Sequence, residues 1–88
     1  MTWWRAHPGS LRLAEGVRYV PDFAYVDAAT SELVYVEVKG AVGWKLDSES
    51  RTKWRTAADL FLWARFEAAI QRRKKDGGGW VVEVYEPR

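Results

Sequence analysis

Two strand-like segments on either side of a polar turn constrain the fold of this chain more than any other feature. The first, VRYVPDFAYV (residues 17–26), is rich in β-branched and aromatic residues, and the second, LVYVEVKG (33–40), alternates in the same way. DAATSE (27–32) between them has the composition of a turn. We therefore predict a β-hairpin, with a bulge or an edge at Pro21, because proline cannot donate a hydrogen bond to a neighbouring strand.

A helical pattern follows the hairpin. Apolar residues recur every three or four positions from about residue 50 to 74, which predicts one long helix. The polar segment before it offers Asp47, Ser48 and Ser50 as N-caps. DGGG (76–79) is expected to end this helix, because glycine accepts the left-handed backbone conformation of a C-terminal cap.

The remaining segments complete a small domain. Residues 1–10 are typical of an irregular lead-in, LRLAEG (11–16) of a short strand, and WVVEVYEP (80–87) of a closing strand. The predicted order is β-β-β-α-β in a single domain over residues 1–88. We expect an α+β (α/β) fold in which a small mixed sheet packs on one main helix.

Composition limits the classes of function. The 88 residues contain no cysteine, which excludes disulfides and thiolate zinc sites. The apolar runs are too short to cross a bilayer, and the first residues lack the order of a signal peptide. We therefore expect a cytoplasmic domain with no membrane partner. Six tryptophans are many for a chain with a small interior, so some are expected at an interface or against a ligand.

Three ionisable residues of the predicted hairpin converge. Glu37 and Lys39 share one face of their strand, with the valines at 36 and 38 on the other, core-facing side. A turn centred between residues 28 and 31 pairs Asp22 with Glu37. Two carboxylates and the backbone carbonyl of Val38 form an all-oxygen site that suits Mg²⁺ or Mn²⁺. Lys39 would orient or deprotonate a water, or offset charge on a phosphate. A solvated ion pair on the outer face of a hairpin is the alternative interpretation.

The segments RYVPDFAYV and LVYVEVKG resemble the PD-(D/E)xK nuclease superfamily. The similarity is greatest to small, Holliday-junction-resolvase-like endonucleases of phages and prophages, in which Y-x-P-D-F precedes a hairpin ending in E/D-V-K-G. It covers roughly residues 11–66. It implies a minimal restriction-endonuclease-like core, metal ligation by Asp22, Glu37 and the Val38 carbonyl, and a catalytic role for Lys39. Gly40 would let the chain leave the strand next to bound DNA.

The chain departs from that family at one point. Family members usually have a helix before the first strand, and this helix adds a glutamate to the site. Only about ten irregular residues precede the first predicted strand here, so the helix is absent or replaced. His7 and Glu15 are the two upstream residues that could supply an additional ligand.

Basic and aromatic residues surround the predicted site in sequence. Arg51 and Arg55 share a face at the start of the predicted helix, with Lys53 off that face and Lys45 in the preceding loop. We expect these four residues to bind DNA phosphates; a solvated helix end is the alternative. RRKK (72–75) is expected at the helix C-terminus, where cations complement the macrodipole, and is not counted as DNA-binding.

The tryptophans near these charges have several possible roles. Trp44 and Trp54 could stack on bases or form a dimer contact, with core packing favoured for Trp54. At least one of Trp3 and Trp4 is expected at an interface. The sequence thus predicts a Mg²⁺- or Mn²⁺-dependent endodeoxyribonuclease that acts as a homodimer on duplex or branched DNA in a bacterial or phage-infected cell. The alternatives are a catalytically inactive nucleic-acid-binding module and a small subunit of a larger DNA-processing complex.

Overall fold

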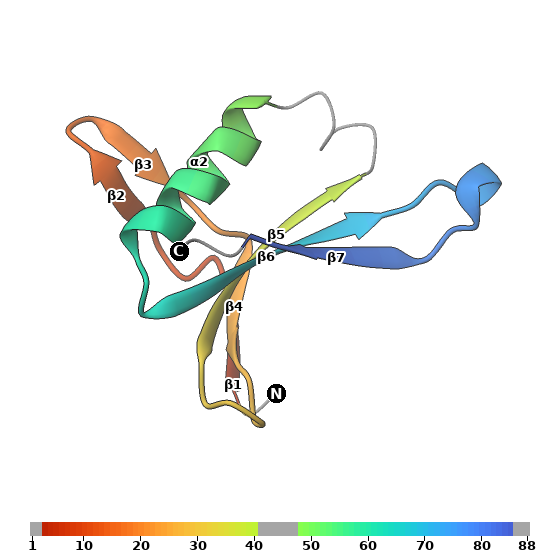
Figure 1. The fold of residues 1–88 in the computed structure, drawn as a ribbon, viewed down its shortest axis with the longest axis horizontal. Coiled ribbons are helices and arrows are strands. Elements are labelled where there is room, and N and C mark those ends of the chain that lie inside the picture. Colours follow the sequence, from red (N-terminus) through yellow and green to blue (C-terminus); the bar gives the residue numbers. More distant parts are fainter. Residues whose placement is uncertain (1–2, 41–47, 86–88) are drawn as a thin grey trace.

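The computed structural model of the chain describes residues 3–40 and 48–85, which form seven strands, one α-helix and one short 3₁₀-helix (Figure 1). In chain order these are β1 (Trp3–Ala6), β2 (Leu11–Ala14), β3 (Val17–Tyr19), β4 (Phe23–Val26), β5 (Leu33–Gly40), α2 (Ser48–Leu60), β6 (Ala64–Gln71), η1 (Lys74–Asp76) and β7 (Trp80–Val84).

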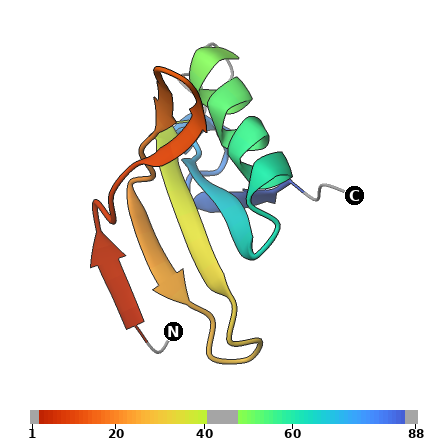
Figure 2. The same ribbon diagram turned by 90° about the vertical axis from the view of Figure 1, so that its left-hand side faces the viewer.

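Five of the strands form one mixed sheet in the order β1-β4-β5-β6-β7, and β2 and β3 form a separate hairpin. All neighbours in the large sheet are antiparallel except β5 and β6, which are parallel and are separated in the chain by α2. Figure 2 shows β1, β4 and β5 side by side, with α2 on one side of them. The protein is thus a small mixed α+β domain, which agrees with the predicted fold class.

The turn between β4 and β5 fixes the register of the predicted hairpin. Asp27 accepts hydrogen bonds from the backbone N–H groups of Ala29, through its carboxylate, and Ser31, through its carbonyl. Ser31 has a φ of 61°, in the left-handed region that closes the turn. The resulting register places Phe23 opposite Val36. The predicted pairing of Asp22 with Glu37 continues this register by one step.

The core lies between the sheet and α2. Trp54, Ala57 and Ala58 project from the helix onto Phe66 and Ala68 of β6, and all five side chains are buried. The alanines let the helix approach the strands closely, and the Trp54 indole N–H donates to the carbonyl of Glu67 (3.2 Å). The β2–β3 hairpin covers the helix from another side, since both of its strands contact α2. The predicted core position of Trp54 is confirmed.

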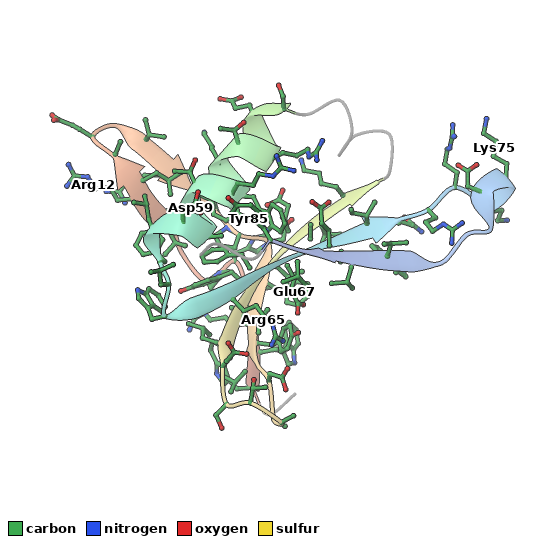
Figure 3. The ribbon with its side chains drawn as sticks, in the orientation of Figure 1. Arg12, Asp59, Arg65, Glu67, Lys75 and Tyr85 are labelled. Carbon is green, nitrogen blue, oxygen red and sulfur yellow. The ribbon has the colours of Figure 1, made fainter. Side chains whose placement is uncertain are left out.

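The opposite face of the sheet contains an ion network centred on Arg65 of β6. Its guanidinium group binds Asp27 and Glu32 at the two ends of the β4–β5 turn, at 2.8 Å each. It also binds Glu67, two residues along β6, at 3.1 Å, and Glu67 in turn accepts a hydrogen bond from the Tyr25 hydroxyl. Figure 3 shows Arg65 and Glu67 close to each other. The hydrogen bond from Arg65 holds the pKa of Asp27 below its ordinary value.

The predicted helix over residues 50–74 is wrong beyond Leu60. Residues 64–71 form β6, because this segment pairs with β5 on one side and with β7 on the other. Its apolar residues alternate with a period of two, so that one face packs under α2 while the other carries the Arg65 network. Tertiary pairing therefore outweighs the helix propensity of its three alanines.

Three other sequence predictions also require correction. RRKK lies between β6 and β7, not at a helix C-terminus, so the macrodipole explanation for these charges fails. DGGG accordingly ends η1 and leads into β7. Residues 3–6, expected to be irregular, form the edge strand β1.

The expected strand over residues 17–26 is divided at Pro21. Its first part, β3, pairs with β2, and its second part, β4, belongs to the large sheet. The interruption at a residue without an N–H donor fits the predicted break in hydrogen bonding. Among the described residues no helix combines the length and the apolar character needed to cross a bilayer.

Candidate active site

Asp22 lies at the interruption between β3 and β4, and three hydrogen bonds fix its position. Its backbone N–H donates to the carbonyl of Val36 (3.0 Å), and its own carbonyl accepts from the N–H of His7 (2.9 Å). Its carboxylate oxygen Oδ2 accepts from the N–H of Val38 (2.7 Å). Both β5 contacts flank Glu37 in the chain, so the carboxylate of Asp22 is anchored next to the strand that carries the second predicted ligand.

Glu37 is the buried member of the site, with only 6% of its surface exposed. Its Oε1 accepts a hydrogen bond from the hydroxyl of Tyr19 (2.8 Å), and its Oε2 lies 3.7 Å from Nζ of Lys39. The shared face of Glu37 and Lys39 is therefore confirmed. This face is the one that packs against α2, since Glu37 is paired in register with the core residue Ala68.

The expectation that Val36 and Val38 both point into the core is correct for Val36 only. Val36 is buried, but Val38 is 38% exposed on the face away from the helix. The reason is that α2 covers only the Glu37 side of β5 at this end of the strand. A solvated ion pair therefore does not describe the site, because its glutamate is desolvated and its hydrogen bonds are internal.

Tyr19 was not identified from the sequence as a site residue. Burial raises the pKa of its phenol above the ordinary value, and the negative charge of Glu37, the hydrogen bond to Glu37 and the charge of Asp22 raise it further. The phenol therefore stays protonated and donates to Glu37, and both carboxylates lie near enough to act on it. The sequence did offer a signal for this residue, since Tyr19 is the tyrosine of the Y-x-P-D-F segment.

The donor set fits a hard divalent cation. Mg²⁺ is commonly held by one or two carboxylates together with waters and substrate phosphates, and the site offers two carboxylates. One oxygen of each is fixed by a hydrogen-bond donor, Val38 N–H for Asp22 and Tyr19 for Glu37. Such donors orient metal-binding carboxylates. Within residues 3–40 and 48–85 no cluster of three or more His, Cys, Asp or Glu residues has the arrangement of a metal site, so the described part of the site is limited to two acids.

The structure separates the two upstream candidates. The backbone of His7 is hydrogen-bonded to Asp22, with His7 in a left-handed conformation (φ 49°). Glu15 lies in the turn between β2 and β3, at the far end of that hairpin from β5 (Figure 1). Residues 3–19 form three strands, so no helix of the described chain takes the place of the upstream helix of the resembled family.

Three of the four predicted phosphate-binding residues lie on α2. Lys53 pairs with Glu49 within α2 (3.8 Å), and Arg55 reaches Glu83 of β7 (4.0 Å) and the ring of Tyr85. Arg51 is half-buried in the first turns of the helix. Lys45, together with Trp44, lies outside the described residues. A role for these residues in binding DNA phosphates remains a prediction.

The edge strand β1 exposes two of the six tryptophans. Trp4 is largely exposed and lines a groove of about 210 Å³ with Ala6, Phe23 and Asp22. Trp3 is exposed to a similar degree. Their role at an interface, and the homodimer, remain predictions.

Comparison with protein-family models, with curated proteins and with solved structures finds no match to this chain.

Replacing Tyr19 with phenylalanine tests the buried contact to Glu37. The change removes the donor to Oε1, so we expect the metal concentration for half-maximal activity to rise by about 10–100-fold. The free energy of unfolding should fall by about 1–3 kcal/mol, because a buried carboxylate loses a partner. Activity measured against Mg²⁺ concentration and urea denaturation measure the two effects.

Tyr35→Phe is the matched control for this experiment. Tyr35 lies on the same face of β5 as Glu37, and its ring packs on Phe66. Its hydroxyl has no hydrogen bond to any described residue. Its removal should change stability by less than about 0.5 kcal/mol and leave the metal dependence unaltered. Equal metal dependence in Tyr19→Phe and the wild type would show that Tyr19 does not position Glu37.

Proposed function

We propose that the protein is a metal-dependent endodeoxyribonuclease of the PD-(D/E)xK type. One observation supports this most: the carboxylate of Asp22 is bound to the backbone of Val38, between Glu37 and Lys39, which themselves form an ion pair. Asp22 thus contacts the end of β5 that carries Glu37 and Lys39. The succession of the β4–β5 hairpin, the helix α2 and the strand β6, parallel to β5, supports the proposal of a minimal restriction-endonuclease-like core.

Asp22 and Glu37 would hold Mg²⁺ or Mn²⁺ with the carbonyl of Val38 as a third ligand. When bound, the ion would supply Lewis-acid chemistry for phosphodiester hydrolysis. Tyr19 keeps Glu37 in one orientation, and the Val38 N–H does the same for Asp22. Both carboxylates are therefore fixed before a substrate arrives, which lowers the cost of organising the site.

Lys39 reaches solvent from the site. Its side chain is 29% exposed, while that of Glu37 beside it is almost fully covered. The ammonium group can therefore contact a phosphate oxygen or a water while Glu37 restricts its position. In this role it offsets negative charge that develops on the phosphate during hydrolysis.

A cleavage assay tests the proposal. Supercoiled plasmid and a four-way branched duplex are incubated with the protein in Mg²⁺, in Mn²⁺ and in EDTA, and we expect cleavage only with metal. Lys39→Ala should reduce the rate by roughly 100-fold or more, since it removes a positioned charge and proton-transfer group. Arg12→Ala, which removes one charge from the exposed side of β2, is the control and should retain the wild-type rate.

One observation favours a second candidate function. Because the described residues bring only two acids together, the domain is also compatible with a nucleic-acid-binding module that has lost catalysis. This alternative predicts salt-sensitive DNA binding without cleavage in either metal. That result would exclude the nuclease proposal.

A further inference from the structure

The connection between β6 and β7 forms a basic loop, defined here as residues 72–79 (RRKKDGGG). Figure 1 shows it at the end of a long two-stranded extension that projects away from α2 and from the β2–β3 hairpin. Four cations and one carboxylate give it a net charge of +3, which exceeds the +2 of the whole chain.

Internal hydrogen bonds give the basic loop a defined shape. Arg72 N–H donates to the carbonyl of Gly79 (2.8 Å), and Gly78 N–H donates to the carbonyl of Arg73 (2.9 Å). Glycines 77, 78 and 79 have φ values of 101°, 63° and 76°, which residues with side chains rarely adopt. The sequence GGG is therefore explained by the backbone conformation, and the loop is not a featureless linker.

The cations of the loop fall into two classes. Arg72 and Arg73 both contact Asp76, the first at its carbonyl and the second at its carboxylate (2.9 Å). Lys74 and Lys75 are exposed, and neither has a hydrogen bond or ion pair to another side chain of the described chain. Figure 3 shows Lys75 at the far end of the extension. The arginines thus brace the loop, and the lysines remain available to an external anion.

The parallel register of β5 and β6 places the basic loop on the same edge of the sheet as the candidate active site. Lys39 lies opposite Ile70, and Gly40 lies opposite Gln71, which immediately precedes the loop. Lys75 is five residues beyond Ile70, so its backbone lies at most about 17 Å further along. That length corresponds to roughly five base pairs of a duplex at about 3.4 Å each.

We infer that Lys74 and Lys75 bind the phosphate backbone of duplex DNA within about five base pairs of the phosphodiester at Asp22 and Glu37. This inference rests on the proposed function, since it is the shared edge with a phosphodiester site that selects DNA over other polyanions. The contact is independent of base sequence, because the loop presents ammonium groups, while its planar side chains, the two arginines and Asp76, bind within the loop. It positions the substrate along the sheet edge.

The salt dependence of binding tests the inference. Affinity for a fluorescent 30-base-pair duplex is measured in EDTA over a range of KCl concentrations for the wild type and for Lys74→Ala/Lys75→Ala. The slope of log K against log salt is negative, and each lost phosphate contact should reduce its magnitude by about 0.9, so we expect the magnitude to decrease by about 1–2. Arg12→Ala/Arg18→Ala removes two charges from the β2–β3 hairpin, on the opposite side of the molecule from Lys75 (Figure 3), and should keep the wild-type slope.

The outcomes separate the inference from the proposed function. An unchanged slope in the lysine variant, with wild-type cleavage intact, would overturn the basic-loop contact and leave the nuclease proposal standing. A reduced slope in a protein that cleaves with neither metal would support the contact and overturn the nuclease. Vesicles of anionic phospholipid serve as a second probe. Lysine-dependent binding to them, with DNA binding unchanged, would overturn the inference in favour of a membrane surface.

Discussion

Glu37→Gln is expected to abolish metal-dependent DNA cleavage while the protein remains folded. The substitution keeps the shape of the side chain and an oxygen that can accept from Tyr19, but it removes the negative charge that would hold the cation and pair with Lys39. Loss of several kcal/mol of transition-state stabilisation corresponds to a rate reduction of roughly 100-fold or more. Plasmid nicking rates at saturating Mg²⁺ measure this effect.

Glu32→Gln is the matched control for Glu37→Gln. Glu32 precedes β5 at the end of the strand away from Glu37 and pairs with Arg65, so its neutralisation removes one carboxylate and one ion pair outside the site. It should leave the cleavage rate within about threefold of the wild type, since partly exposed pairs contribute about 1 kcal/mol or less. Cleavage by Glu37→Gln at the wild-type rate, with both variants folded by circular dichroism, would contradict the role assigned to Glu37.

Trp54→Ala is expected to be the most destabilising single substitution in the described core. The indole is fully buried between α2 and β6, donates to the carbonyl of Glu67 and packs on the ring of Tyr85 (6.2 Å between centroids). Truncation of a buried tryptophan costs about 3–5 kcal/mol, through lost burial and the cavity left behind. A small domain has about 5–15 kcal/mol of stability, so the variant should be substantially less stable or unfolded.

Urea denaturation followed by far-ultraviolet circular dichroism measures this loss, with Trp63→Ala as the control. Trp63 lies in the turn before β6 and is 62% exposed, and it contacts Phe61 and Tyr35 edge-on. Its removal should cost less than about 1.5 kcal/mol. Similar losses for the two tryptophans would mean that the helix–sheet interface is not the main source of stability.

The hairpin and its site could be predicted from sequence because their determinants are local. The turn DAATSE, the proline before Asp22 and the alternation of LVYVEVKG lie within 24 consecutive residues, from 17 to 40. Together they give the register that places Phe23 opposite Val36 and brings Asp22 to the Glu37 region. Short-range turn chemistry and a period of two were sufficient for these contacts.

The strand β6 could not be predicted in the same way, because its conformation depends on distant partners. ARFEAAIQ contains three alanines and follows a helix without an intervening glycine or proline, so its local propensity favours more helix. Pairing with β5 and β7 determines its structure. The alternation of Ala64, Phe66, Ala68 and Ile70 with more polar residues was the available signal. The wrong assignment also misplaced RRKK, and this concealed the basic loop.

Tyr19 was missed for a related reason. Its contact with Glu37 joins residues 18 positions apart and depends on the way β3 leaves the β2–β3 hairpin toward the sheet. Single-sequence patterns place Tyr19 within a strand but do not indicate which side chain it will contact. A buried carboxylate such as Glu37 requires a hydrogen-bond donor, and here the donor follows from the separate β2–β3 hairpin.

The ion network around Arg65 has a consequence for how the site is assembled. Arg65 joins β6 to Asp27 and Glu32, residues 38 and 33 positions earlier in the chain. The ion pairs between Arg65 and the turn can therefore form only when β6 lies beside β5. Long-range contacts of this kind are formed late in folding, because the loop-closure entropy must be overcome first. A partly unfolded chain in which β6 has separated from β5 would thus lose the ion pairs that join the β4–β5 turn to the rest of the sheet.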